Sequence, residues 1–144
     1  MNFDWKAEGF AAAPVLTTAT GTERLYRAWG GTSTQLGNPK GKGVCFSFDR
    51  ARTRAEAELL YAVMEWNNGV MRLTEFSVPK GLPLWVGRVD PGDRRAALGH
   101  ASGSQVFVER GYVKSVIPGA TTTLTNDLGP NQFVVNAALN TANH

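Results

Sequence analysis

Three polar side chains stand out because each lies on or beside an expected strand, close to glycines. Arg27 precedes Gly30 and Gly31, Ser47 follows a glycine-rich segment at 30–43, and Gln105 follows Gly103 and Ser104. A guanidinium is permanently charged and can bind a diphosphate through a bidentate fork. A hydroxyl and an amide can hydrogen-bond sugar hydroxyls or position a water. Since inward positions of buried strands are usually apolar, we interpret these side chains as lining one polar cleft.

Each of these residues taken alone also fits a purely structural role. Arg27 could lie on the solvent face of an edge strand, and Ser47 could be the outer position of a half-buried strand. Tyr26, Trp29 and Phe46 could stack an aromatic ligand ring, although core packing is the usual role of aromatic side chains.

The chain offers little material for metal or thiol chemistry. It contains one cysteine and two histidines, which argues against an internal disulfide and against a Cys- or His-based metal site. We interpret Cys45, between Val44 and Phe46, as a small buried hydrophobe.

The elements that would position these residues are mainly strands. Thr53 and Glu56 have capping-box spacing at the start of one amphipathic helix that extends to Trp66. Alternation and turn signals predict strands at Glu23–Trp29, Val44–Phe48, Met71–Val78, Leu84–Val89, Gln105–Arg110 and Val113–Ile117, with a further edge strand at Asn131–Val135. The expected fold class is therefore α+β: a β-rich domain with one principal helix packed on a small mixed or antiparallel sheet.

Length and composition indicate a single globular domain. The 144 residues divide into an N-terminal arm at 1–22, a domain at 23–136 and a tail at 137–144. The formal charge is +3, but the basic residues are dispersed, so we expect a small-molecule ligand and not a nucleic acid. No apolar run approaches the roughly 18 residues of a membrane span, and the start does not follow the order of a signal peptide. We expect no membrane association and a cytoplasmic site of action, which is also compatible with a domain of a secreted effector.

Taken together, three fragments resemble the signatures of a known enzyme superfamily. Leu25-Tyr26-Arg27, Phe46-Ser47 and Gly103-Ser104-Gln105-Val106 are similar to the Arg, Ser-centred and Glu/Gln signatures of the ADP-ribosyltransferase superfamily. The stretch 73–89 is also similar in style to the central strands of bacterial polymorphic-toxin domains of that fold. In site chemistry the chain most resembles NAD+ glycohydrolase toxin domains of the tuberculosis-necrotizing-toxin type. The similarity spans about residues 23–110.

The resemblance implies an enzyme that consumes NAD+ as its substrate, needs no metal and has an immunity or antitoxin protein as partner. It implies that Arg27 binds the diphosphate or ribose, Ser47 shapes the nicotinamide-ribose pocket and Gln105 takes the catalytic position. The remaining NAD-binding positions are expected at Tyr26, Trp29, Gly30 and Phe46.

The sequence departs from the superfamily pattern in two places, and the missing acidic motif favours hydrolysis over transfer. No Ser-Thr-Ser triplet follows Phe46, and the paired acidic motif of arginine-modifying transferases is missing. We therefore expect an NAD+ glycohydrolase. The alternatives are an ADP-ribosyltransferase acting on a protein or nucleic acid, and a non-catalytic nucleotide-binding or interaction module.

Overall fold

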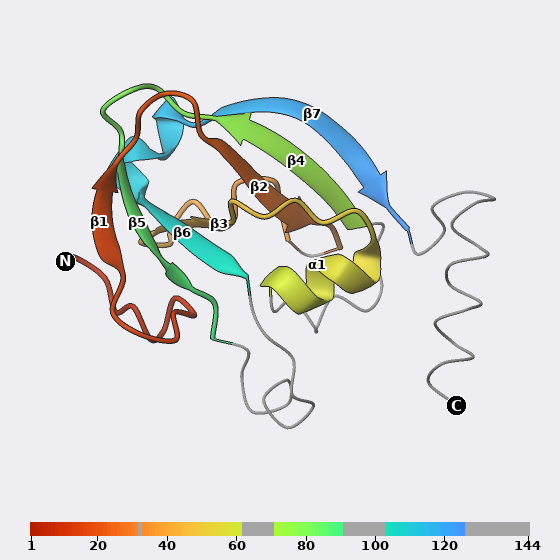
Figure 1. The fold of residues 1–144 in the computed structure, drawn as a ribbon, viewed down its shortest axis with the longest axis horizontal. Coiled ribbons are helices and arrows are strands. Elements are labelled where there is room, and N and C mark those ends of the chain that lie inside the picture. Colours follow the sequence, from red (N-terminus) through yellow and green to blue (C-terminus); the bar gives the residue numbers. More distant parts are fainter. Residues whose placement is uncertain (32, 62–70, 91–102, 126–144) are drawn as a thin grey trace.

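The computed structural model describes residues 1–31, 33–61, 71–90 and 103–125, and over these ranges the chain is rich in β-strands (Figure 1). Two short helices accompany the strands. In chain order the elements are β1 (Val15–Thr18), β2 (Arg24–Trp29), β3 (Gly43–Phe46), α1 (Arg54–Tyr61), β4 (Met71–Ser77), β5 (Pro83–Arg88), β6 (Ser104–Glu109), the 3₁₀-helix η1 (Arg110–Ser115) and β7 (Ile117–Leu124).

The strands form two antiparallel sheets, ordered β1-β5-β6-β3 and β2-β4-β7. The sheets meet where β2 passes the end of β3: Tyr26 N donates to Ser47 O at 2.7 Å, and Ser47 N donates to Tyr26 O at 2.9 Å. The expected β-rich character is confirmed. The antiparallel arrangement, one of the two expected, is confirmed. The expectation of a single sheet was wrong, because β2, β4 and β7 pair among themselves to form a separate sheet.

The main hydrophobic core lies between the two sheets. Leu25 of β2, Phe76 of β4 and both Val106 and Val108 of β6 are fully buried in one cluster. The ring of Phe46 packs edge-on against Phe76, with ring centroids 5.0 Å apart. Alternate residues of β6 therefore face this core, as the two-residue period of a strand requires.

The opposite face of β6 is covered by the N-terminal arm. Phe3 and Phe10 pack with Phe107 in a second cluster, and the Phe3 and Phe107 ring centroids are 4.3 Å apart. In Figure 1 the arm continues into β1, which lies beside β5. Because both of its faces are covered, β6 is a central, buried strand.

Helix α1 begins as the capping pattern predicts. Glu56 N donates to Thr53 Oγ1 at 3.0 Å, which satisfies one of the free N–H groups of the first turn. The Glu56 carboxylate accepts from Arg52 N at 3.3 Å, one residue earlier than a standard capping box requires. At its other end α1 lies beside the start of β6, where Gly103 N donates to Leu60 O at 3.2 Å.

Two local predictions differ from the structure. The strand expected at Val113–Ile117 was wrong: this segment is mostly η1, and a strand starts only at Ile117, which pairs with Ser77. Strand β1 was not predicted, because Val15–Thr18 is exposed throughout and has no alternating pattern. The helix beyond Tyr61, the strand at Asn131–Val135 and the tail at 137–144 lie outside the described residues.

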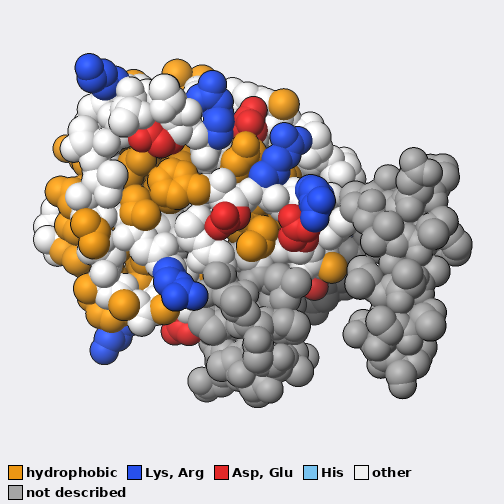
Figure 2. All heavy atoms as spheres, in the orientation of Figure 1, with side chains coloured by type: hydrophobic (Ala, Val, Ile, Leu, Met, Phe, Trp, Pro, Cys, Tyr) orange, Lys and Arg blue, Asp and Glu red, His pale blue; other side chains and the backbone are white. Residues whose placement is uncertain are grey.

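Basic side chains do not gather on the face drawn in Figure 2, where Lys and Arg are dispersed among acidic side chains. Within the described ranges, no helix is long and apolar enough to cross a membrane.

Candidate functional site

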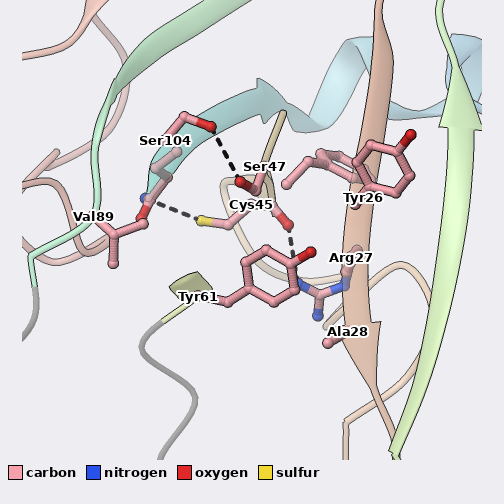
Figure 3. A pocket seen from close by; sticks show the side chains of 10 residues that line it. Tyr26, Arg27, Ala28, Cys45, Ser47, Tyr61, Val89 and Ser104 are labelled. Carbon is pink, nitrogen blue, oxygen red and sulfur yellow. Dashed lines mark hydrogen bonds between the residues drawn. The ribbon is translucent and has the colours of Figure 1, made fainter. Parts of the chain in front are cut away.

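One pocket brings together most of the side chains that the sequence singles out. It has a volume of about 70 Å³ and lies where β2, β3 and β6 meet (Figure 3). The β2–β3 bridge and the β3–β6 pairing carry residues distant in sequence to this point. The pocket is lined by Tyr26, Arg27, Ala28, Cys45, Phe46, Ser47, Tyr61, Val89, Ser104 and Gln105.

Two of the expected NAD-binding residues do not line this pocket. The indole Nε1 of Trp29 donates to Thr74 Oγ1 at 2.9 Å, within the other sheet. Gly30 forms an isolated β-bridge with Ser33 through paired backbone hydrogen bonds of 3.1 and 2.9 Å. Phe46 borders the pocket, but its side chain belongs to the core and the residue is only 4% exposed. Among the three expected aromatic residues, Tyr26 also lines the pocket, but its hydroxyl donates to Glu75 Oε1 at 3.0 Å and the Arg50 guanidinium lies over its ring.

Arg27 is a partly buried cation that holds the loop after β2 against β3. Its Nε donates to Gln35 O at 3.1 Å, its Nη1 to Cys45 O at 3.1 Å and its Nη2 to Ser33 Oγ at 3.4 Å. No carboxylate of the described residues forms an ion pair with it. Burial lowers the pKa of Arg27 from its ordinary value. A guanidinium with only neutral acceptors around it is a favourable partner for an anion.

Ser47 belongs to a network built around one carboxylate oxygen. Asp49 Oδ2 accepts from Ser104 N at 2.7 Å, from Ser104 Oγ at 2.8 Å and from Ser47 Oγ at 3.3 Å. The two hydroxyls also lie 3.1 Å apart and line the pocket together (Figure 3). A negative charge is thereby held directly behind the pocket wall.

Gln105 is 5% exposed and is held by the N-terminal arm. Its Nε2 donates to Glu8 O at 2.6 Å and to Cys45 Sγ at 3.4 Å. Both amide hydrogens are thus used, while no described residue donates to Oε1. The N-terminal arm therefore fixes the orientation of the Gln105 amide, whose Oε1 can still accept a hydrogen bond.

Cys45 lies beside this amide but lacks the character of a nucleophile. Burial, aided by the charge of Glu8 and opposed by Arg27, raises the pKa of its thiol to about 12. The thiol is therefore neutral near pH 7, whereas the thiolate is the reactive form. Cys45 was interpreted as a small buried hydrophobe, whereas the structure shows it half-buried and lining the pocket.

Sequence reasoning missed two polar residues that support the pocket. Asp49 was not singled out, although Ser-x-Asp directly after a strand is a local hydrogen-bonding signal: Asp49 N donates to Ser47 Oγ at 3.0 Å. Tyr61 lines the pocket from α1, accepts from Ala51 N at 2.8 Å and donates to Asp49 O at 2.5 Å. Burial is the main cause that raises the pKa of Tyr61. No sequence signal pointed to Tyr61, because its contacts with Ala51 and Asp49 depend on how α1 packs against the preceding segment.

Within the described part of the chain, no group of three or more His, Cys, Asp or Glu residues could hold a metal ion. No family model, curated protein or solved structure matches this sequence or this fold.

Proposed function

We propose that the protein cleaves NAD+ at the nicotinamide–ribose bond, as an NAD+ glycohydrolase with a site of the ADP-ribosyltransferase type. The observation that carries this proposal is the meeting of Arg27, Ser47 and Gln105 in one pocket, although 20 and 58 residues separate them along the chain. Arg27, which has no described acidic partner, supplies the charge that a diphosphate needs.

The proposed reaction breaks the bond between C1′ of the ribose and the ring nitrogen of nicotinamide. Nicotinamide leaves as a neutral molecule because the ring takes up the bonding electrons, so no general acid is needed. The ribose becomes oxocarbenium-like, as in glycoside hydrolysis. Water then bonds to C1′ and releases a proton, and the products are ADP-ribose and nicotinamide.

Arg27, Gln105 and Asp49 have separate roles in this scheme. Arg27 binds the diphosphate, and Gln105 Oε1 accepts a hydrogen bond from a ribose hydroxyl or from the attacking water. Gln105 carries no charge to stabilise the developing cation. Asp49, held behind Ser47 and Ser104, supplies the negative field that the amide lacks.

A non-catalytic nucleotide-binding module is the second candidate, and two observations favour it. The pocket of about 70 Å³ is far smaller than the ~300–1,000 Å³ typical of small-molecule sites. Arg27 and Gln105 also donate to acceptors of the chain itself. NAD+ binding by the enzyme therefore requires side chains around the pocket to move apart, whereas a module would bind only part of a nucleotide.

The test is incubation of purified protein with NAD+, with free nicotinamide and ADP-ribose followed by chromatography. We expect turnover by the native protein and its loss in Gln105→Ala. The matched control is Gln35→Ala, because Gln35 lies outside the pocket and its side chain donates to Thr74 Oγ1 at 3.3 Å. Circular dichroism of both variants checks that the fold survives.

The outcomes separate the candidate functions. An unchanged rate in Gln105→Ala would defeat the catalytic assignment, and no turnover with retained NAD+ binding would favour the module. ADP-ribose found on protein or nucleic acid of an added lysate would indicate a transferase. Gln105→Glu is a demanding test of that alternative, since a carboxylate would lose the hydrogen bond to Glu8 O.

A further inference from the structure

A second hollow lies at the other end of β6, away from the pocket. It is a groove of about 490 Å³ whose charged and aromatic lining comes from Lys40, Lys42, Glu109, Arg110 and Tyr112. Arg110 follows Gln105 by five positions along β6 and into the start of η1, which at about 3.4 Å per position is roughly 17 Å. The groove is therefore a separate site from the pocket of Gln105.

Arg110 fixes the loop that carries the two lysines. Its backbone N donates to Lys42 O at 2.8 Å, and its Nε donates to Gly41 O at 3.1 Å. Its Nη2 donates to Asn38 O, while Asn38 Oδ1 accepts from Lys40 N at 2.9 Å. The loop is thus tied to the end of β6, and both lysines are exposed at the groove.

The groove has an excess of positive charge. Lys40, Lys42 and Arg110 face a single carboxylate, Glu109, which accepts from Trp85 Nε1 at 3.2 Å. The ion pair recorded among the described residues joins Arg52 and Glu56 elsewhere, so neither lysine has an acidic partner there. Nη1 of Arg110 donates to no described residue. These cations remain available to phosphate oxygens.

An aromatic ring completes the lining. Tyr112 is 46% exposed and stands in the same groove as the three cations. Aromatic rings beside basic side chains bind nucleotides by stacking the base while the cations hold the phosphates. We propose that this groove binds a nucleotide, with its phosphates on Lys40, Lys42 and Arg110 and its base on Tyr112. The nucleotide is either free or part of a single-stranded nucleic acid.

The test is isothermal titration calorimetry of the whole chain with ADP, with inorganic pyrophosphate and with a short single-stranded oligonucleotide. Lys40→Gln/Lys42→Gln should weaken nucleotide binding by tenfold or more. The matched control, Lys80→Gln/Lys114→Gln, removes the same charge from exposed positions outside the groove and should change affinity less than twofold. Tyr112→Ala should weaken ADP binding and leave pyrophosphate binding unchanged.

Several results would overturn the proposal: no binding of ADP or the oligonucleotide at millimolar concentration, equal weakening by both double variants, or pyrophosphate binding as tightly as ADP. Tighter binding of the oligonucleotide than of ADP identifies a strand as the source of the nucleotide, and the reverse identifies a free nucleotide. Both results support nucleotide binding in the groove.

The proposals for the pocket and for the groove can be tested independently. Lys40→Gln/Lys42→Gln should leave nicotinamide release unchanged, and Gln105→Ala should leave binding in the groove unchanged. If Gln105→Ala lost ADP binding while Lys40→Gln/Lys42→Gln retained it, the binding would belong to the pocket. That result would overturn the proposal of a nucleotide site in the groove.

Discussion

At the scale of single residues, Asp49 holds the most concentrated set of hydrogen bonds at the pocket. Its Oδ2 accepts from a backbone N–H and from two hydroxyls. Asp49→Asn removes the negative charge that strengthens these hydrogen bonds. The new amide can also place an N–H group against the N–H and hydroxyl donors, which then lose their acceptor. We expect a loss of about 1–3 kcal/mol in the free energy of unfolding, measured by urea denaturation.

The control for Asp49→Asn is Glu58→Gln on α1, because Glu58 accepts no hydrogen bond or ion pair from a described residue. It should change the free energy of unfolding by less than about 0.5 kcal/mol. Equal effects of the two substitutions would remove Asp49 from its supporting role. Asp49→Asn should also slow nicotinamide release at saturating NAD+, if its charge stabilises the developing cation as proposed.

Cys45 makes stability depend on alkaline pH. Burial raises the pKa of its thiol from 9.0 to about 12, so between these values the folded chain keeps a proton that the unfolded chain releases. The stabilisation is complete below pH 9 and is lost as the pH rises towards 12. We expect Cys45→Ala to lose stability less steeply than the native protein over this window, by up to roughly 1 kcal/mol per pH unit.

Urea denaturation of both proteins at a series of pH values from 8 to 11 measures this difference. Tyr61, whose pKa is also raised by burial, contributes equally to both proteins and cancels in the comparison. Parallel pH profiles for the two proteins would contradict the prediction.

At the scale of elements, the pairing of β3 with β6 requires glycine at its first residue. A Cβ at Gly43 would overlap the carbonyl oxygen of Val108 and lie 2.6 Å from the ring of Phe107. Gly43→Ala should therefore cost about 1–3 kcal/mol through overpacking, measured as a shift of the urea midpoint.

Gly111 in η1 is the matched control for Gly43, because a Cβ there meets nothing within 4 Å. Gly111→Ala should leave the urea midpoint nearly unchanged. If Gly43→Ala were equally neutral, the close approach of β3 to β6 would be disproved.

At the scale of the whole molecule, the N-terminal arm forms part of the core. Phe10 is 1% exposed and packs with Phe3 and Phe107, on the face of β6 that also carries Gln105. Phe10→Ala should cost about 3–5 kcal/mol, a large share of a typical domain's stability. Because the arm shares this core, fluorescence and circular dichroism should report one common urea transition, shifted as a unit.

The control for Phe10→Ala is Phe48→Ala, since Phe48 is 36% exposed and should tolerate truncation far better. If Phe10→Ala leaves no folded protein, Phe10→Leu preserves most of the volume and should give a smaller, measurable shift. Separate transitions for the arm and the sheets would contradict a shared core.

Elements with local signals could be predicted from the sequence. The alternation in β2, β4, β5 and β6, the turns between them and the Thr53 cap are all read from short windows, and the structure places these elements within one or two residues of the prediction. Arg27, Ser47 and Gln105 were singled out in the same way, because a polar side chain on an expected buried strand close to glycines departs from the usual local pattern.

How these elements combine depends on contacts between segments that are far apart in the chain. Ser104 and Asp49 are 55 residues apart, and their hydrogen bonds exist because β6 pairs with β3. The residues of β1 are all exposed, so its sequence has no alternating pattern. Its strand conformation follows from its pairing with β5. The division into two sheets likewise follows from long-range pairing and packing, which no short window of sequence contains.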